Sequence, residues 1–424
     1  MKKILLFGAG KSATCLIDFL IAETRSRNWK FTVVDSDPQL LQSKVPQTGH
    51  VSGLAVSVTD GEQRRELIRD ASIVISLLPP ALHFLVSQDC LEYGKNLLTA
   101  SYLDEKIINL KPQIEKKQLL FLGEMGLDPG IDHMSAMELI QRIKDQGGRI
   151  NSFKSHTGGL VAPESDDNPW HYKISWNPRN VVLAGSGGAV YRQDGQVVSK
   201  KYETLFTDCE ELEIPGAGRL AYYPNRDSLA YIPVYQLEDT KTFIRTTLRY
   251  PAFCKGWKSI VMAGLPDDKK AIATNGMTCR NWSAPVLPFI NEDNRTLLEY
   301  LGFFDDSPVP RTSRTSADIL QSLLEQKLVM LPGDRDMIVM YHEIGYEIDK
   351  RKFEIKSRLI VKGKDSTRTA MAKTVGLPLG IAAILILEEQ IRLTGLHIPI
   401  IPEIYIPVLR KLKEQDILFT ESFN

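Results

Sequence analysis

Cysteine is scarce in this chain, and its spacing creates no metal or disulfide framework. Five cysteines are spread over 424 residues, and no two of them form a C-x-x-C pair. Zinc ribbons and small disulfide-rich folds need such clusters, so both classes are excluded. The seven histidines show no metal-ligand spacing either, and we expect no metal site. This cysteine usage fits a reducing compartment, and we expect a cytoplasmic protein.

An excess of one charge and a membrane-length apolar run are also missing. Lys plus Arg and Asp plus Glu both number 52, whereas a protein that binds nucleic acid usually carries a basic excess. The most apolar stretch, residues 379–387, is much shorter than the ~20 residues that cross a bilayer and predicts a buried helix. The apolar run at the N-terminus stops at Gly8, so we interpret it as a first strand. We expect neither nucleic acid nor a membrane as a partner.

The N-terminal residues contain an apolar strand, a glycine-rich turn and an amphipathic helix, in that order. Residues 4–7 are apolar, and Gly8-Ala9-Gly10-Lys11-Ser12-Ala13 follows them. In such a turn the first glycine permits the bend, Gly10 lets a phosphate approach the backbone, and Ala13 allows the helix to pack closely. We expect this turn to bind the pyrophosphate of a dinucleotide at a helix N-terminus.

A carboxylate ends the second predicted strand, residues 31–35, and bears on which dinucleotide is bound. Asp35 can accept hydrogen bonds from a ribose 2′-hydroxyl and would repel a 2′-phosphate. We therefore expect NAD in preference to NADP, although Ser36 and Lys44 could weaken that preference. The alternative is that the glycines are ordinary turn residues and that Asp35 only caps the next helix.

Further apolar runs, separated by helical stretches, occupy residues 51–58, 70–78, 96–102 and 118–122. Together with the first two they predict six strands of a doubly wound parallel sheet. We predict an α/β protein whose residues 1–128 form a Rossmann-type dinucleotide-binding domain.

The stretch at residues 123–134 joins the last of these strands to a helix predicted from Ile131. Asp128 therefore lies at the carboxyl end of a strand, where open α/β sheets bind their ligands. An acid at this place can take up and release a proton during catalysis. The alternative is that Asp128, next to Pro129, is a helix N-cap.

The remainder predicts a second, mixed α/β domain with a helical insertion. We assign residues 129–251 with 334–395 to this substrate-binding and dimerisation domain, 252–333 to the insertion, and 396–424 to a segment that packs back on the first domain. In the second domain, residues 157–169 are rich in Gly, Pro and Asx and predict a functional loop.

Strict alternation at residues 242–250 predicts a strand with Arg245 and Arg249 on one face. Two arginines on a buried face would bind anions, while the alternative is a solvated edge strand whose charges are paired. Both interpretations stay open at this point.

Six stretches in different parts of the chain carry a more specific signal. They are residues 126–133 (GLDPGIDH), 158–164 (GGLVAPE), 172–176 (YKISW), 223–228 (YPNRDS), 247–250 (TLRY) and 370–376 (AMAKTVG). In this order they resemble motifs of the glutamate-forming saccharopine dehydrogenases, also called saccharopine reductases. The resemblance implies an NAD(P)-dependent oxidoreductase of lysine metabolism that cleaves saccharopine reversibly to L-glutamate and 2-aminoadipate 6-semialdehyde. It also implies a homodimer, but the sequence does not give the physiological direction.

The same resemblance implies the site residues. Asp128 and Tyr102 are implied in catalysis. The implied cofactor-binding residues are Gly8, Gly10, Lys11, Ser12, Ala13, Asp35, Ser57, Val58, Leu77, Leu78, Thr99, Leu127, Pro129 and Ser175. The implied substrate-binding residues are Ser101, Tyr102, Asp128, Gly158, Ile174, Arg226, Arg245 and Thr247. Saccharopine carries three carboxylates, and arginine makes the bidentate carboxylate contact that lysine cannot.

Two positions depart from the family pattern. His156-Thr157 replaces a Tyr-Cys pair, and Ile174 replaces an aromatic residue. His156 could act as a proton relay, since imidazole titrates near neutrality. The competing interpretations are a related C–N oxidoreductase, such as a carboxynorspermidine dehydrogenase, and a nucleotide-binding protein without turnover.

Overall fold

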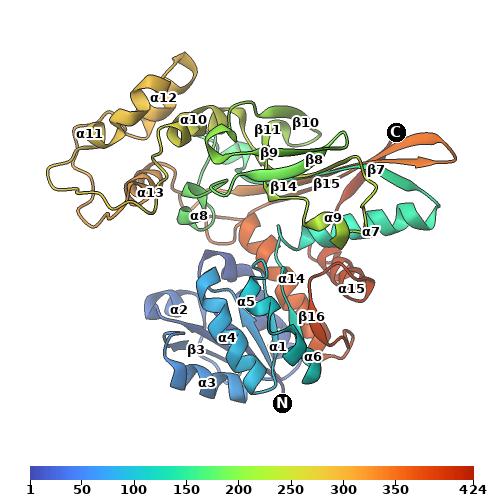
Figure 1. The fold of residues 1–424 in the computed structure, drawn as a ribbon. Coiled ribbons are helices and arrows are strands. Elements are labelled where there is room, and N and C mark those ends of the chain that lie inside the picture. Colours follow the sequence, from blue (N-terminus) through green and yellow to red (C-terminus); the bar gives the residue numbers. More distant parts are fainter. The chain divides into compact units, whose positions relative to one another are not determined.

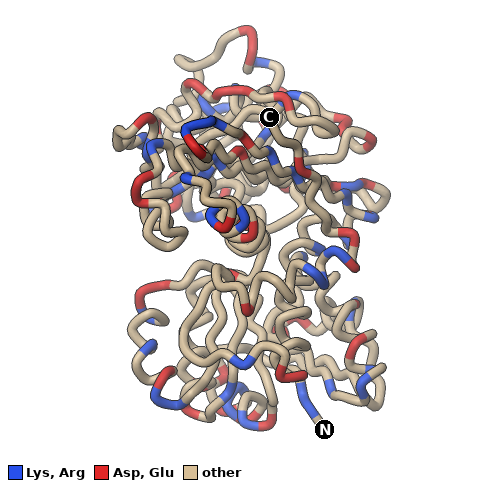
Figure 2. Tube along the Cα trace, turned by 90° about the vertical axis from the view of Figure 1, so that its right-hand side faces the viewer, with Lys and Arg blue, Asp and Glu red and all other residues tan.

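The computed structural model describes residues 1–424 and divides them into two compact units. Unit 1 comprises Met1–Arg142 and Thr367–Leu418, and unit 2 comprises Ile143–Ser366 and Phe419–Asn424. Figure 1 labels the elements of both. Basic and acidic residues are interspersed along the trace of each unit (Figure 2), in keeping with the zero net charge.

Unit 1 is built on a parallel sheet of seven strands in the order β16-β6-β5-β4-β1-β2-β3. The strands are β1 (Lys3–Phe7), β2 (Lys30–Asp35), β3 (Val51–Ala55), β4 (Ile73–Ser76), β5 (Asn96–Thr99), β6 (Leu120–Leu122) and β16 (Gly395–His397). The order 3-2-1-4-5-6 is that of dinucleotide-binding folds, which confirms the Rossmann-type prediction. The seventh strand, β16, was not expected from the sequence.

Helices connect these strands, and several begin at side-chain caps. They are α1 (Thr14–Ser26), α2 (Pro38–Lys44), α3 (Gly61–Asp70), α4 (Pro80–Glu92), α5 (Glu105–Ile108), α6 (Lys111–Lys116), α7 (Ile131–Asp145), α14 (Ala370–Leu387) and α15 (Pro402–Lys413). Asp37 caps α2 and Asp60 caps α3, each accepting two backbone N–H bonds. These caps satisfy donors that a helix start leaves unpaired.

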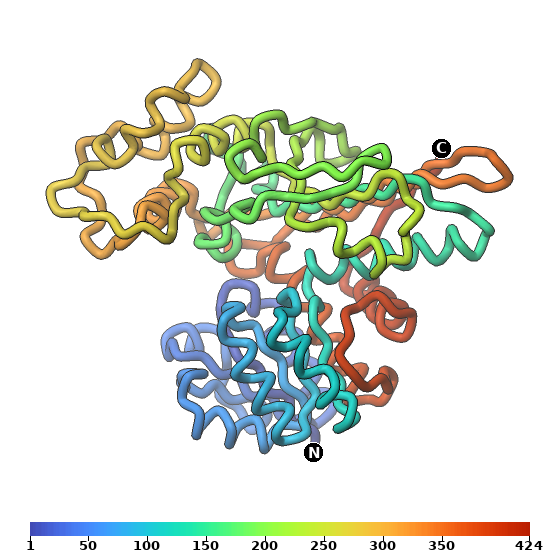
Figure 3. Tube along the Cα trace, in the orientation of Figure 1, coloured from blue at the N-terminus to red at the C-terminus, as the bar shows by residue number.

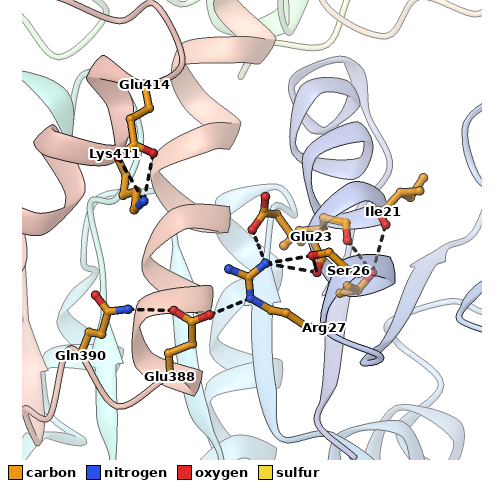
Figure 4. Close-up of polar contacts among 10 residues, drawn as sticks. Ile21, Glu23, Ser26, Arg27, Glu388, Gln390, Lys411 and Glu414 are labelled. Carbon is orange, nitrogen blue, oxygen red and sulfur yellow. Dashed lines mark hydrogen bonds and ion pairs between the residues drawn. The ribbon is translucent and has the colours of Figure 1, made fainter.

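Helix α14 comes from the far end of the sequence and packs against α1 in unit 1. Gly376 and Gly380 allow the close approach, because a Cβ at either position would lie within 3 Å of Leu16. At the other end of both helices, Arg27 donates to Glu23 and to Glu388 (Figure 4). By length and hydropathy α14 could span a membrane, but 83% of it is buried inside the fold, as predicted for its apolar run.

The structure divides the chain differently from the predicted domain boundaries. Residues 367–395, which we expected in the second domain, belong to unit 1 through α14 and β16. The C-terminal segment belongs to unit 1 as far as Leu418, but β17 (Thr420–Phe423) pairs with a strand of unit 2. These pairings join segments far apart in sequence, which composition and periodicity do not reveal.

Unit 2 is built on a mixed sheet of ten strands. Its main path is β10-β11-β13-β7-β14-β15-β17, and β8, β9 and β12 lie off it. The strands are β7 (Arg149–Val161), β8 (Ala189–Gln193), β9 (Gln196–Lys200), β10 (Glu210–Ile214), β11 (Gly218–Pro224), β12 (Arg226–Asp227), β13 (Thr242–Arg249), β14 (Asp336–Ile348), β15 (Arg351–Lys362) and β17. The predicted mixed α/β domain is confirmed.

Helices dominate the part of unit 2 between β13 and β14, which Figure 3 draws in yellow to orange. They are α10 (Pro251–Met262), α11 (Cys279–Ser283), α12 (Glu292–Tyr300) and α13 (Ser316–Lys327), and α8 (Pro178–Val182) and α9 (Tyr231–Val234) precede them in the chain. The predicted helical insertion is therefore present. Its core stacks Phe253 on Trp257, and Trp170 contacts both rings edge-on.

Two local predictions in unit 2 are corrected. Residues 157–161, expected at the start of a loop, continue β7 and pair with β14 along their whole length. β13 is not a solvated edge strand, because it lies between β11 and β7. Both Arg245 and Arg249 are buried, so neither is a solvated charge.

Candidate functional site

The glycine turn after β1 has one glycine that the protein itself requires and one that it does not. Gly8 has a φ of +101°, and a Cβ there would lie 2.5 Å from the carbonyl oxygen of Leu77. Gly10 has an ordinary φ of −58°, and a Cβ there would meet nothing within 4 Å. The absence of a side chain at Gly10 therefore leaves open space against the backbone, which a bound group can fill.

The N–H groups of this turn fit a pyrophosphate. A short 3₁₀ turn (Lys11–Ala13) leads into α1, and the amides of Gly10, Lys11 and Ser12 have no acceptor in the protein. Unpaired N–H groups at a helix start favour an anion there. The predicted pyrophosphate-binding residues thus lie together, and Ala13 is buried behind them.

Asp35 and Lys44 both contact the glycine turn. One carboxylate oxygen of Asp35 accepts a 2.7 Å bond from the Ala9 N–H and the other accepts a 3.0 Å bond from the Asp37 N–H. The Lys44 ammonium donates to the carbonyl oxygens of Ala9 and Gly10, both at 2.8 Å. Burial lowers the pKa of Lys44, while Asp35 acts in the opposite direction. An anion and a cation therefore flank the position expected for the ribose.

The other predicted cofactor-binding residues of unit 1 lie in the segments that follow β3, β4 and β6, apart from Thr99, which ends β5. They are Ser57, Val58, Leu77, Leu78, Thr99, Leu127 and Pro129. Because carboxyl ends of parallel strands share one edge of the sheet, these segments lie at the edge that holds the glycine turn. The side chain of Val58 is buried in the core and its carbonyl accepts a bond from Arg64, which argues against a role in ligand binding.

Asp128 lies in a short closed loop after β6. The Gly126 N–H donates to the Pro129 carbonyl at 2.9 Å, and a Cβ at Gly130 would collide with the Gly126 backbone. Helix α7 begins only at Ile131, so Asp128 is not its N-cap. Its half-buried carboxylate instead accepts a 3.2 Å bond from the Tyr102 hydroxyl. The two predicted catalytic residues are therefore in direct contact.

A buried contact between Glu124 and His133 supports this loop. Glu124 has a left-handed backbone with φ of +56°, and its carboxylate lies 2.9 Å from Nε2 of His133. His133 is fully buried. The Glu124 N–H also donates to the carbonyl of Ser101 at 3.1 Å. This contact joins the segment carrying Tyr102 to the segment carrying Asp128.

The predicted carboxylate-binding residues Arg226, Arg245 and Thr247 belong to unit 2. Arg245 is 2% exposed, and its guanidinium lies 4.5 Å from the centre of the Tyr231 ring. Arg226 is exposed on β12 with φ of +52°. The Asn225 N–H donates to the Arg245 carbonyl at 2.8 Å, so the two arginine-bearing segments lie side by side.

Arg249, on the same face of β13, has a structural role. Its guanidinium lies 5.3 Å from the rings of both Tyr172 and Phe253 and donates to the Leu248 carbonyl. Burial raises the pKa of Tyr223 to about 12, with smaller lowering effects from Arg249 and Thr247. This arginine thus lies beside a pair of aromatic rings in the core.

The ring of His156 contacts two polar side chains of neighbouring strands. Its Nδ1 lies 2.7 Å from the hydroxyl of Thr246, and its Nε2 lies 3.2 Å from Glu343. Because successive side chains of a strand point to opposite faces, Thr246 and its partner His156 lie on the face away from Arg245 and Thr247. His156 therefore does not share a face with Arg245, and its interpretation as a proton relay stays a prediction. Thr157, the next residue of β7, lies on the same face of the sheet as Arg245.

Three further predicted residues of unit 2 have packing roles or are buried. Ile174 is buried in the hydrophobic core, and its N–H donates to the Leu328 carbonyl, which argues against a substrate contact through its side chain. A Cβ at Gly158 would lie 2.7 Å from the Leu248 carbonyl oxygen, so close strand packing explains this glycine. Ser175 is 5% exposed.

Sequence reasoning missed the contacts of Lys44 and His83. Lys44 was considered only for its charge, although it holds the glycine turn. His83 was passed over because it shows no metal-ligand spacing, yet its ring lies 2.8 Å from the predicted substrate-binding Ser101. A histidine one turn into the helix that follows a strand end was the available signal. No group of three His, Cys, Asp or Glu that could hold a metal ion is present.

Comparison with known proteins matches both parts of the chain. The model described as "Saccharopine dehydrogenase NADP binding domain" covers residues 4–122, and "Saccharopine dehydrogenase C-terminal domain" covers residues 126–418. The chain is 34% identical to the mitochondrial alpha-aminoadipic semialdehyde synthase of Bos taurus, over 99% of this chain and 47% of that protein. It thus spans about half the length of these synthases.

A full-length match comes from yeast. The saccharopine dehydrogenase (NADP(+), L-glutamate-forming) of Saccharomyces cerevisiae is 32% identical over 98% of this chain and 97% of that protein. The solved structure of the apo saccharopine dehydrogenase (L-Glu forming) from the same organism has a TM-score of 0.87 and 30% identity, covering all of both chains. The chain belongs to the saccharopine dehydrogenase family.

Proposed function

We propose that this protein oxidises saccharopine with a nicotinamide dinucleotide to give L-glutamate and 2-aminoadipate 6-semialdehyde. The observation that carries the proposal is the Tyr102–Asp128 contact, in the same unit as a glycine turn in which the amides of Gly10, Lys11 and Ser12 are unpaired. The family resemblance supplies the reaction, and the yeast relative's name supports it.

The reaction removes a hydride from the carbon bonded to the secondary amine nitrogen and a proton from that nitrogen, and water then cleaves the resulting imine. The dinucleotide, when bound, accepts the hydride. Asp128 takes the proton of the amine N–H, returns it to the imine nitrogen, and as a carboxylate then takes a proton from the attacking water as a general base. Tyr102 donates to Asp128 and fixes the orientation of its carboxylate. Arg226 and Arg245 bind substrate carboxylates, since guanidinium groups match their geometry.

For the cofactor we propose a preference for NAD⁺ over NADP⁺. The carboxylate of Asp35, which accepts a hydrogen bond from the Ala9 N–H of the glycine turn, would repel a 2′-phosphate. The names of the yeast relatives, which specify NADP(+), point the other way, and Lys44 supplies a nearby cation. The ratio of kcat/KM for the two dinucleotides decides the question, and a ratio in favour of NADP⁺ would contradict the role of Asp35.

The central test is Asp128→Asn, assayed by NAD(P)H formation from saccharopine. Loss of a positioned acid–base group costs about 10²-fold to 10⁴-fold in rate, and the pH dependence that Asp128 imposes should disappear. Asp268→Asn, at an exposed aspartate, is the matched control and should behave as wild type. Turnover within a few-fold of wild type across the pH range would show that Asp128 is not the acid–base group.

The same assay separates the alternatives. A panel of secondary amino acids compares saccharopine with substrates of related C–N oxidoreductases, and Ala substitutions at Arg226 and Arg245 test how many carboxylates are bound. Dinucleotide binding without turnover on any of them would favour a non-catalytic protein. A cytoplasmic location and a homodimer stay predictions.

A further inference from the structure

A buried histidine lies behind the predicted substrate-binding serine of unit 1. His83 is in the first turns of α4 and is 3% exposed. Its Nδ1 lies 2.8 Å from the hydroxyl of Ser76, at the end of β4, and its Nε2 lies 2.8 Å from the hydroxyl of Ser101, just beyond β5. We call these three residues the Ser76–His83–Ser101 cluster.

Backbone contacts fix the position of Ser101 within the cluster. Its N–H donates to the Thr99 hydroxyl at 3.3 Å, and its carbonyl accepts from the Glu124 N–H at 3.1 Å. The Thr99 carbonyl in turn accepts from the N–H of Met125 at 3.0 Å. These backbone contacts do not determine the direction of the Ser101 O–H. That direction depends on His83, because its ring contacts the Ser101 hydroxyl.

The proton count of the cluster selects one arrangement. Burial lowers the pKa of His83 to about 4, with a smaller opposing effect from Asp104, so the ring is neutral at pH 7 and carries one N–H. Ser76 is fully buried, and its contact is with Nδ1. If Nδ1 carried the hydrogen, the Ser76 O–H would be a buried donor without an acceptor, which is unfavourable.

The favoured arrangement therefore runs in one direction. The Ser76 O–H donates to Nδ1, and the Nε2–H donates to the Ser101 oxygen. Ser101 already receives one hydrogen from the ring, so its own O–H points elsewhere as a donor. Hydrogen bonds arranged in series polarise one another, which strengthens this terminal donor without placing a charge in the site.

We propose that His83 is a positioning residue that, as an Nε2–H imidazole held by Ser76, presents the Ser101 hydroxyl as a donor to a substrate carboxylate. This inference rests on the proposed function, because the carboxylate belongs to the proposed substrate. A neutral relay suits this role, since the donor it creates keeps the same direction throughout the neutral pH range. His83 itself does not touch the substrate.

The ring form is tested first, without any assay of activity. Histidine labelled with ¹⁵N is incorporated into the full-length protein, and the ring nitrogens are observed by ¹H–¹⁵N correlation at pH 7. The His83 signals are identified by their loss in H83N. A neutral ring protonated at Nε2 is expected, and S76A should abolish this preference. An Nδ1–H tautomer or a charged ring in the wild type would overturn the proposal.

The second test uses two substitutions that place an amide differently. The Gln side chain in H83Q is long enough to bring an N–H near the Nε2 position, whereas the Asn side chain in H83N reaches only the Nδ1 position. Hydrogen bonds to charged groups are worth about 10-fold to 100-fold in binding. We expect H83N to raise KM for saccharopine by this factor with a smaller change for the dinucleotide, and H83Q to restore most of it.

Two controls keep the outcomes separate. H397N makes the same change at a histidine that contacts only the nearby Thr394 carbonyl and should leave kinetics unchanged. Equal KM values for saccharopine in H83N and H83Q would overturn the positioning role while leaving the proposed reaction intact. If the wild-type protein binds a dinucleotide but never oxidises saccharopine, the proposed function is wrong. The ¹⁵N measurement would then still show whether His83 is the neutral Nε2–H tautomer.

Discussion

His83 should make unit 1 sensitive to acid. Its pKa in the folded protein is about 4 because of burial, compared with the ordinary value of 6.5. Between these two pH values the unfolded chain binds more protons than the folded one, so the free energy of unfolding falls as the pH falls. A difference of one pH unit between the two pKa values corresponds to about 1.4 kcal/mol. Above pH 6.5 the neutral ring therefore contributes about 3 kcal/mol to the free energy of unfolding, and this contribution is lost as the pH approaches 4.

The substitution that isolates this effect is H83Q, because glutamine does not titrate. Unit 1 is followed by hydrogen exchange of amides in β4 and β5 in increasing urea, at several pH values from 7 to 4. The difference in free energy of unfolding between wild type and H83Q should change by about 3 kcal/mol over this range. H397Q should show no such change relative to wild type.

A difference that stays constant from pH 7 to pH 4 would refute the reasoning. It would mean that His83 titrates alike in the folded and unfolded states, so the ring would not be held neutral by burial. Other groups also titrate in this range, and they act on both proteins equally. The comparison between variants therefore cancels their contribution.

Two further predictions follow from local geometry. Gly8→Ala places a Cβ at 2.5 Å from a carbonyl oxygen at a φ of +101°. This should lower the free energy of unfolding by roughly 1–3 kcal/mol and weaken dinucleotide binding in a fluorescence titration. Unchanged stability and affinity would show that the turn relaxes freely. Asp89→Ala leaves the buried guanidinium of Arg64 without the carboxylate that lies 2.6 Å away, so urea denaturation should show a loss of about 3–5 kcal/mol. Asp70→Ala, at an exposed pair with Lys3, should cost less than about 1 kcal/mol, and equal losses would contradict the role of burial.

The parallel sheet of unit 1 could be predicted because its signals are local. Each strand is a short apolar run, and the glycine turn, Asp35 and the joint around Asp128 follow strand ends within a few residues. The order of the strands then follows from general rules for open α/β sheets. Tyr102 and Asp128 were implied in catalysis by the family resemblance, and they meet because they follow neighbouring strands, β5 and β6.

The missed features depend on segments that are distant in sequence. α14 was assigned to the wrong domain because its apolar surface is continuous and does not indicate which partner covers it. Only Gly376 and Gly380, which face α1, identify the partner. The burial of β13 was also undecided, because alternating Arg and Thr residues fit a solvated strand as well as one covered on both faces.

His83 shows why site residues of this kind escape sequence reasoning. Its two serine partners are 7 and 18 residues away, and neither spacing is that of a known motif. The role arises only when β4 and β5 lie side by side with Ser76 opposite Thr99, so that one ring can reach both strand ends. A residue that orients a ligand-binding hydroxyl from behind needs no contact with the ligand, and its function therefore follows from its proton count and from burial rather than from its position in a pattern.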